Sequence, residues 1–199
     1  MKGGELSIYG NPGRLSADYA CSSVDHLPRR TVMSHIHRIT PCLWFDHQAE
    51  AAAQFYCSIF EHSRITALTH YGKAGFEFHG RPEGSVMTVS FELDGQTFTG
   101  LNGGPVFQFN EAVSLQVNCQ NQGEIDHFWS ALSYGGAPEA QQCGWLKDKF
   151  GLSWQIVPCA LNHWMTDPDT AKSQRVMQAL LQMKKLDIAA LERAFAGES

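Results

Sequence analysis

The feature that most constrains this chain is an order of predicted elements that occurs twice. Each time, a strand is followed by a helix and then by further strands, as alternating and 3–4 spaced apolar residues indicate. The first set of elements covers residues 39–45, 49–60, 64–71, 85–93 and 96–102. The second set covers residues 112–119, 124–134, 139–142, 144–147 and 153–157. We therefore expect an α+β fold of two βαβββ modules, at about 36–104 and 110–158, which together form one domain over 36–158.

The clearest strand pair lies at 85–102. Apolar and small polar residues alternate along residues 85–93, and Asp94-Gly95 is a strong hairpin signal before the returning strand. Such alternation gives a sheet one apolar face, which a helix can cover, and one polar face.

The two ends of the chain differ from the middle. Residues 1–34 are rich in turn formers without apolar periodicity, which predicts a disordered leader or extension, and Met33 is then a candidate native start. Residues 159–197 predict a helical extension, with helices at 160–165, 167–183 and 187–195. Its Met and Leu content favours packing on a sheet edge or on a partner subunit.

Composition narrows the class of function. A net charge of −5 and a pI near 6.0 argue against a nucleic-acid partner, and the apolar runs are too short for a membrane span. Six cysteines are scattered without a CxxC pair, which fits reduced thiols in a cytoplasmic protein better than a disulfide framework.

The polar faces of the predicted strands carry short, neutral side chains where an ordinary solvated sheet would carry Lys and Glu. Two such faces would form a cup that binds a small molecule, although a plain solvent-exposed face is the open alternative. Glu92 is the acid on these faces and the candidate general base, unless it is only a solvated residue near a strand end. The faces carry Thr40, Cys42, Trp44, Thr88, Ser90, Ser114, Gln116, Ser153 and Gln155.

Several segments resemble one known family. ITPCLWFDHQAEAAAQFYCSIF, SVMTVSFELDGQTFTGLNGGP, FNEAVSLQVNC and QCGWLKDKFGLSWQIVP are similar to the PhnB-like branch of the vicinal oxygen chelate (glyoxalase/bleomycin resistance) superfamily. That branch carries the label 3-demethylubiquinone-9 3-methyltransferase. The resemblance covers about residues 36–197 and implies paired βαβββ modules, a cup-shaped mixed sheet and a homodimer.

The resemblance also bears on metal and cofactor. Metal-dependent members of the superfamily use histidine and carboxylate ligands at positions that match Thr40, Leu101 or Asn102, Ala112 and Gln155 here. Hydroxyl and amide groups bind a transition metal poorly, so we expect a cup without a metal or other cofactor. A divalent-metal dioxygenase or isomerase with other ligands is the alternative. The expected ligand-binding residues are Thr40, Trp44, Ser90, Asn102, Ser114, Gln116, Ser153 and Gln155.

The methyltransferase label is a further alternative. Transfer from S-adenosylmethionine usually needs a glycine-rich turn between a strand and a helix. The pairs Gly103-Gly104 and Gly135-Gly136 do not supply that turn, because the first precedes a proline and the second ends a helix.

The hairpin at 142–158 holds three more hypotheses. Gly151 suggests a close approach of the backbone to another group. Cys143 is either a nucleophile or an inert thiol, and Lys147 and Lys149 form either a carboxylate clamp or a solvated turn. Elsewhere, His70 and His79 border a polar loop at 72–84 that is a candidate lid.

Overall fold

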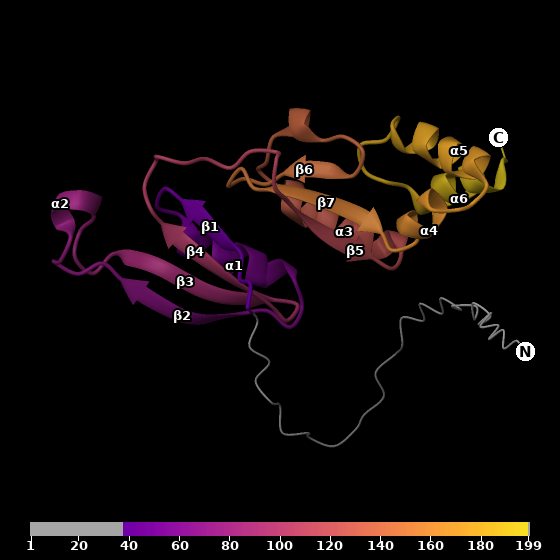
Figure 1. Ribbon diagram of the computed structural model, residues 1–199. Helices are drawn as coiled ribbons and strands as arrows, with labels where there is room; N and C mark the ends of the chain where they lie inside the picture. Colours follow the sequence, from indigo (N-terminus) through magenta and orange to yellow (C-terminus); the bar gives the residue numbers. More distant parts are fainter. Residues whose placement is uncertain (1–37, 199) are drawn as a thin grey trace, which may run out of the picture. The chain divides into compact units, whose positions relative to one another are not determined.

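Two mixed β-sheets, one in each predicted module, organise residues 38–198, which are the residues that this computed structural model describes (Figure 1). The expected leader, Met33 and the first residues of the first module lie outside the described residues. In the described residues, no helix is long and apolar enough to cross a membrane.

The first sheet has four strands in the order β1-β4-β3-β2. β1 runs parallel to β4, whereas β3 pairs antiparallel with both β4 and β2. The helix α1 follows β1 and covers one face of this sheet (Figure 1), and Leu43, Phe45, Val89 and Phe91 are buried on that face. The elements of this module are β1 (Cys42–Phe45), α1 (Ala49–Ile59), β2 (Arg64–His70), α2 (Phe76–His79), β3 (Val86–Leu93) and β4 (Gln96–Asn102).

The loop expected at 72–84 contains one short helix. α2 lies between Gly75 and Gly80, both of which have positive φ angles of 81° and 62° that favour glycine. Figure 1 shows α2 at the end of the long β2–β3 pair, and Phe76 and Phe78 within it are exposed.

The second sheet has three strands in the order β5-β7-β6. β5 and β7 are parallel, and β6 pairs antiparallel with β7. The module consists of β5 (Ser114–Cys119), α3 (Gln122–Ser133), the 3-10 helix η1 (Pro138–Ala140), β6 (Trp145–Lys147) and β7 (Ser153–Pro158). It is therefore a shortened copy of the first module.

The strand expected at 139–142 is wrong. Residues 138–140 form η1, and a single bridge between Gln142 and Trp145 is all that remains of a ladder there. Pro138 explains the difference, because its fixed φ angle and missing N–H suit the first turn of a helix and oppose a paired strand.

The C-terminal helices form a small core of their own around Val157, Trp164, Val176, Leu186 and Leu191. Two backbone hydrogen bonds connect this extension to the second module: Cys143 N donates to Met183 O at 2.8 Å, and Gly144 N donates to Lys184 O at 2.7 Å. The extension thus packs on the hairpin before β6. Its helices are α4 (Leu161–Met165), α5 (Thr170–Leu180) and α6 (Ile188–Ala196).

The fold class predicted from the sequence is confirmed: the chain is α+β, with a mixed sheet and a helix in each module followed by C-terminal helices. Within the described residues, the two sheets are not hydrogen-bonded to each other. β1 and β5, the opening strands of the two modules, each lie at the edge of their sheet.

Candidate functional site

The polar face of the second sheet brings together four of the predicted ligand-binding residues. The strand register places Ser114, Ser153 and Lys147 in one row across β5, β7 and β6. Gln116, Gln155 and Trp145 form the next row. Paired residues of adjacent strands project from the same side of a sheet, so these six side chains share one surface, here called the second-sheet face.

Hydrogen bonds on the second-sheet face are incomplete. Gln155 Nε2 donates to Ser114 Oγ at 2.8 Å, and Gln116 Nε2 donates to Asn118 Oδ1 at 2.7 Å. Ser153 is fully buried, and its hydroxyl has no hydrogen-bond partner within residues 38–198. Lys147 forms an ion pair with Glu111, which lies in the segment before β5.

Several groups on the polar face of the first sheet are satisfied internally. The hydroxyls of Thr69 and Thr88 hydrogen-bond to each other at 2.5 Å. Glu92, the candidate general base, forms an ion pair with Arg64 at 2.9 Å across β3 and β2. This contact supports the structural role that the sequence left open for Glu92.

Trp44 also has a structural contact. Its Nε1 donates to Gly104 O at 2.8 Å, and its ring packs edge-on against Phe107 with centroids 5.0 Å apart. A Cβ atom at Gly103 would lie 2.1 Å from the indole, so the glycine is needed for this packing. Ser90 lies on the same side of the sheet as Cys42, in register through Thr99, whereas Thr40 is exposed and precedes β1.

Asn102 lies on the opposite, helix-covered side. Its Oδ1 accepts from Ala49 N at 2.8 Å and its Nδ2 donates to Val86 O at 3.0 Å, and the residue is 6% exposed. Gln48, at the N-cap position of α1, makes no side-chain cap, so Asn102 supplies that acceptor from the neighbouring strand. The alternating phase of β4 places Leu101 on the open face where the prediction had placed Asn102.

Asp148 is the functional-looking residue that the sequence did not reveal. The Lys-Asp-Lys turn suggested a solvated carboxylate, yet Asp148 is 3% exposed. Tyr56 Oη and Trp154 Nε1 each donate to its Oδ2 at 2.8 Å. The N–H groups of Phe150 and Leu152 donate to its Oδ1 at 2.8 and 3.1 Å.

Burial raises the pKa of Asp148 above its usual value, although the four donors act in the opposite direction. Burial beside this carboxyl also raises the pKa of Tyr56. Because Tyr56 belongs to α1 and Asp148 follows β6, the network connects the two modules. The signal for it was strand phase: Asp148 is two residues after buried Leu146 and so projects to the same side.

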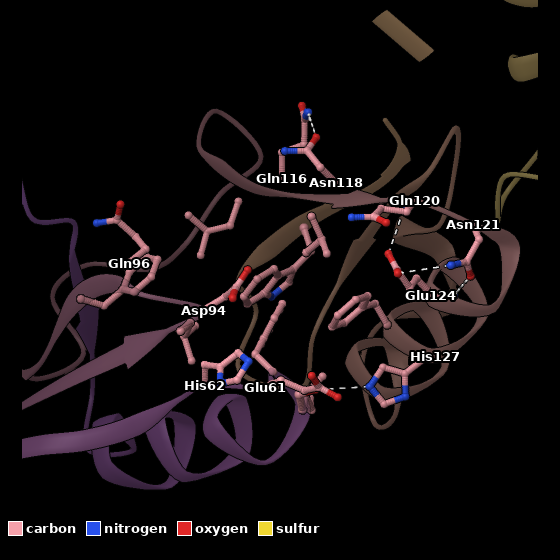
Figure 2. A pocket seen from close by; sticks show the side chains of 18 of the residues that line it. Glu61, His62, Asp94, Gln96, Gln116, Asn118, Gln120, Asn121, Glu124 and His127 are labelled. Carbon is pink, nitrogen blue, oxygen red and sulfur yellow. Dashed lines mark hydrogen bonds between the residues drawn. The ribbon is translucent and has the colours of Figure 1, made fainter. Parts of the chain in front are cut away.

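A cleft of about 1010 Å³ lies between the C-terminal end of α1, the β3–β4 hairpin, β5 and α3. Phe60, Phe128 and Trp154 line it and stack, with ring centroids 5.0 Å and 5.6 Å from Phe60. In Figure 2, Gln116 and Asn118 project from β5 away from Glu61 and His62. The sequence analysis did not anticipate this cleft.

Several polar groups of the cleft serve local structure. Asn121 Oδ1 accepts from Glu124 N at 3.0 Å, and Glu124 Oε2 accepts from Gln120 N at 2.8 Å. The first of these bonds caps the start of α3, and the second holds the residue before the cap (Figure 2). A ring nitrogen of His127 lies 3.3 Å from Ile59 O. Glu124 and Asn121 of the cleft therefore hold the start of α3.

Cys143 and the candidate lid at 72–84 both make contacts that hold the fold together. Cys143 has a φ angle of 54°, and its N–H connects the hairpin to the C-terminal extension. His79 packs against Tyr71 with ring centroids 4.4 Å apart, and Arg81 Nη2 donates to Asp46 Oδ1 at 2.9 Å, which anchors the 72–84 loop.

The close approach expected at Gly151 is wrong, because no atom of the described residues lies within 4 Å of a Cβ built there. The residue has a φ angle of 86° and serves the turn. The close approach is at Gly144, where a Cβ would lie 3.0 Å from Ile156 O.

The residues that match superfamily metal ligands do not fit a divalent ion. Thr40 and Gln155 offer neutral oxygens, Leu101 and Ala112 offer no side-chain donor, and the Gln155 amide donates to Ser114. Within residues 38–198, no group of three or more His, Cys, Asp or Glu side chains is placed to hold a metal ion.

The starts of the helices α1 and α3 do not fit S-adenosylmethionine. The β1–α1 turn, at 46–48, contains no glycine, and the N–H that begins α1 is taken by Asn102. The first turn of α3 is capped in the same way by Asn121. At each helix start, an asparagine side chain therefore already occupies one of the N–H groups that could bind a cofactor's charged groups.

Comparison with known proteins places this architecture. The chain aligns with the PhnB protein of Bacillus cereus, which is provisionally described as a 3-demethylubiquinone-9 3-methyltransferase. The alignment covers 61% of this chain and 98% of the PhnB chain, with 34% identity and a TM-score of 0.53. A glyoxalase/bleomycin resistance protein/dioxygenase domain from Frankia aligns over 60% of this chain and 90% of its own length, with 13% identity and a TM-score of 0.40. No curated protein matches the chain.

Paired modules of this kind, with the match to PhnB, define a PhnB-like protein. Residues 37–157 match the sequence profile of the family described as 3-demethylubiquinone-9 3-methyltransferase. The chain belongs to that family, as the sequence resemblance predicted.

Proposed function

We propose that this PhnB-like protein binds or transforms a small organic molecule on the second-sheet face, without a resident metal ion. The observation that carries the proposal is the pair of cross-strand rows, which present hydroxyls, amides, an ammonium group and an indole on one surface. Ligand sites commonly combine an apolar wall with a few placed polar groups, and these rows have that composition.

The first sheet provides less capacity for a ligand. The hydroxyls of Thr69 and Thr88 contact each other, its acid contacts Arg64, and its indole contacts the backbone. We therefore place the ligand's polar handles on Ser114, Ser153 and Gln155. Glu92 and the first-sheet residues Trp44 and Ser90 would form the opposite wall if a cup closes over the ligand.

A homodimer is the assembly that we propose to close the cup. β1 and β5 each have an unpaired edge in the described residues, and the apolar residues just before them, Ile39 and Val113, are 83% and 67% exposed. Exposed apolar groups beside open strand edges favour pairing with another chain. Sedimentation or light scattering should give a dimer, and Val113→Glu should shift it toward monomer; a monomeric wild type contradicts this part.

A cytoplasmic location completes the proposal, and the scattered cysteine thiols of the sequence support it. Methyl transfer, the activity in the family's description, makes a separate prediction. It requires S-adenosylmethionine to bind, and calorimetry with this compound should show no binding heat under our proposal. Saturable heat would favour the described activity instead.

The decisive experiment locates the ligand. A fragment screen read by tryptophan fluorescence and by amide chemical shifts should give hits that perturb Ser114, Gln155 and Trp145. Gln155→Ala and Ser114→Ala should weaken these hits while the free energy of unfolding changes little. Gln96→Ala is the matched control, because Gln96 is an exposed amide that lines the aromatic cleft. Hits that depend on Gln96 and ignore Gln155 would move the site to the cleft.

A further inference from the structure

We propose that the second-sheet face is specific for a monocarboxylate, which Lys147 and Ser153 receive together. This inference rests on the proposed function and adds the chemical class of the ligand. It starts from the row Ser114–Ser153–Lys147, in which a buried hydroxyl lies between a second hydroxyl and an ammonium group.

Ser153 provides the first observation. It is fully buried, and its Oγ has no hydrogen-bond partner among the described residues. Buried polar groups in native proteins are almost always paired, so an unpaired hydroxyl indicates a missing acceptor or donor. The register turns this side chain toward the polar face, beside Lys147 on β6. A ligand oxygen on that face would supply the missing partner.

Lys147 provides the second observation. Its side chain is 25% exposed, and its ammonium group pairs with Glu111, whose side chain is 64% exposed. The hydrogen bond from Lys147 lowers the pKa of Glu111. A carboxylate thus already occupies the position beside Lys147, and it comes from an exposed segment before β5. An ion pair with such an exposed partner contributes little, so a ligand carboxylate can replace Glu111 at small cost.

The neighbouring groups define the rest of the ligand. Trp145 and Gln155 occupy the adjacent row, which offers an indole surface and an amide to the body of the molecule. Lys149, the other lysine of the hairpin, lies 4.0 Å from the centroid of the Phe55 ring and belongs to a different surface. In the described residues, the two rows contain a single cation, which matches one negative charge. An aromatic or apolar monocarboxylate fits these groups.

Benzoate, with its neutral counterpart benzamide, is the probe. The wild type should bind benzoate with a saturable change in tryptophan fluorescence. Lys147→Met should weaken binding about tenfold or more, because a charge-assisted hydrogen bond is lost. Ser153→Ala should weaken it about threefold to tenfold and should fold normally, since no existing hydrogen bond is removed. Glu111→Gln should tighten it by about threefold, because the competing carboxylate is gone.

Lys149→Met is the matched control, and it should leave benzoate binding unchanged. Equal benzoate affinity of the wild type and Lys147→Met would overturn the inference, as would no binding by both the wild type and Glu111→Gln. Benzamide separates the two proposals. If benzamide binds in a Gln155-dependent manner and benzoate does not, the proposed site stands and the carboxylate specificity falls. If neither compound perturbs the second-sheet residues, both proposals fall.

Discussion

The two sheets of this protein both place the opening strand at one edge, parallel to the last strand of its module, but their polar faces differ in hydrogen bonding. On the first sheet, Thr69 pairs with Thr88, Glu92 with Arg64, and Trp44 with the backbone of Gly104. On the second sheet, Ser153 has no hydrogen-bond partner in the described part of the chain, and Lys147 pairs with the exposed Glu111. A face whose groups are satisfied stabilises the fold, whereas a face with spare capacity can bind. Under our proposal, the first module therefore has a structural role and the second module binds the ligand.

The buried polar residues have a structural role in both modules. Asn102 of the first module holds the start of α1, and Asp148 of the second module holds Tyr56 on the same helix. α1 is therefore fixed by both modules, and its attachment to the second module depends on a carboxylate. The following predictions, from the largest expected effect to the smallest, test these assignments.

Asp148→Ala should have the largest effect. It leaves Tyr56 Oη, Trp154 Nε1 and two backbone N–H groups buried without an acceptor. We expect a loss of about 3–5 kcal/mol in the free energy of unfolding, measured by denaturant titration. Tyr56→Phe removes one of the four donors and should cost about 1 kcal/mol. A cost below that of Tyr56→Phe for Asp148→Ala would mean that the network does not connect the modules.

Asn102→Ala should have the next largest effect. Ala49 N and Val86 O lose their partner inside the helix-covered side of the first sheet. The expected loss is about 1–3 kcal/mol of stability, with ligand binding on the second-sheet face unchanged. Asn118→Ala, at an exposed asparagine of β5, is the control and should cost about 0.5 kcal/mol or less. If Asn102→Ala weakened binding without loss of stability, the original interpretation of Asn102 as a ligand residue would be right.

The stability of the protein should depend on pH because Asp148 titrates differently in the folded and unfolded states. Its pKa is raised in the folded protein, so the folded state holds this proton more tightly than the unfolded chain. The resulting stability is fully present below the unfolded value near 3.8 and is lost as the pH rises through the folded pKa. The slope contributed by one group cannot exceed about 1.4 kcal/mol per pH unit.

Asp148→Asn removes this titration and should flatten the stability profile above pH 3.8 relative to the wild type. Chemical denaturation at a series of mildly acidic pH values measures both profiles. Asp126→Asn is a control, because Lys185 lowers the pKa of that exposed carboxyl and its contribution has the opposite sign. Parallel profiles for the wild type and Asp148→Asn would contradict the raised pKa.

The architecture could be predicted from the sequence because most of its strands and helices have regularly spaced apolar residues. The strands at 85–102 and the helix at 49–60 bury apolar residues at fixed spacing, and their contacts are local or between adjacent strands. The prediction of a strand at 139–142 was wrong because Pro138 changes the local backbone preference. The spacing of apolar residues does not reveal this change. The segment at 72–84 contains a one-turn helix too short for periodicity to indicate.

The candidate site could be predicted only in part from the sequence. Alternation correctly placed Ser114, Gln116, Ser153 and Gln155 on one side of their strands. It could not show that Ser153 lacks a partner, because that depends on which groups approach from elsewhere in the fold. Asp148 was missed since a Lys-Asp-Lys turn has the composition of a solvated loop, and the donor Tyr56 lies 92 residues away. The cleft is likewise formed by segments distant in sequence.

Glu92→Gln should have the smallest effect and gives the sharpest test of the comparison. The side chain is 27% exposed and pairs with Arg64, whose side chain is 72% exposed. Such pairs contribute about 0–1 kcal/mol, so the variant should unfold at nearly the wild-type denaturant concentration. Arg64→Gln is the matched control, because it removes the same ion pair and keeps the carboxylate. Under our assignment, both variants bind benzoate like the wild type. Weaker binding or lost turnover with Glu92→Gln alone would show that the first sheet supplies the general base, and the division between a structural and a recognition face would fail.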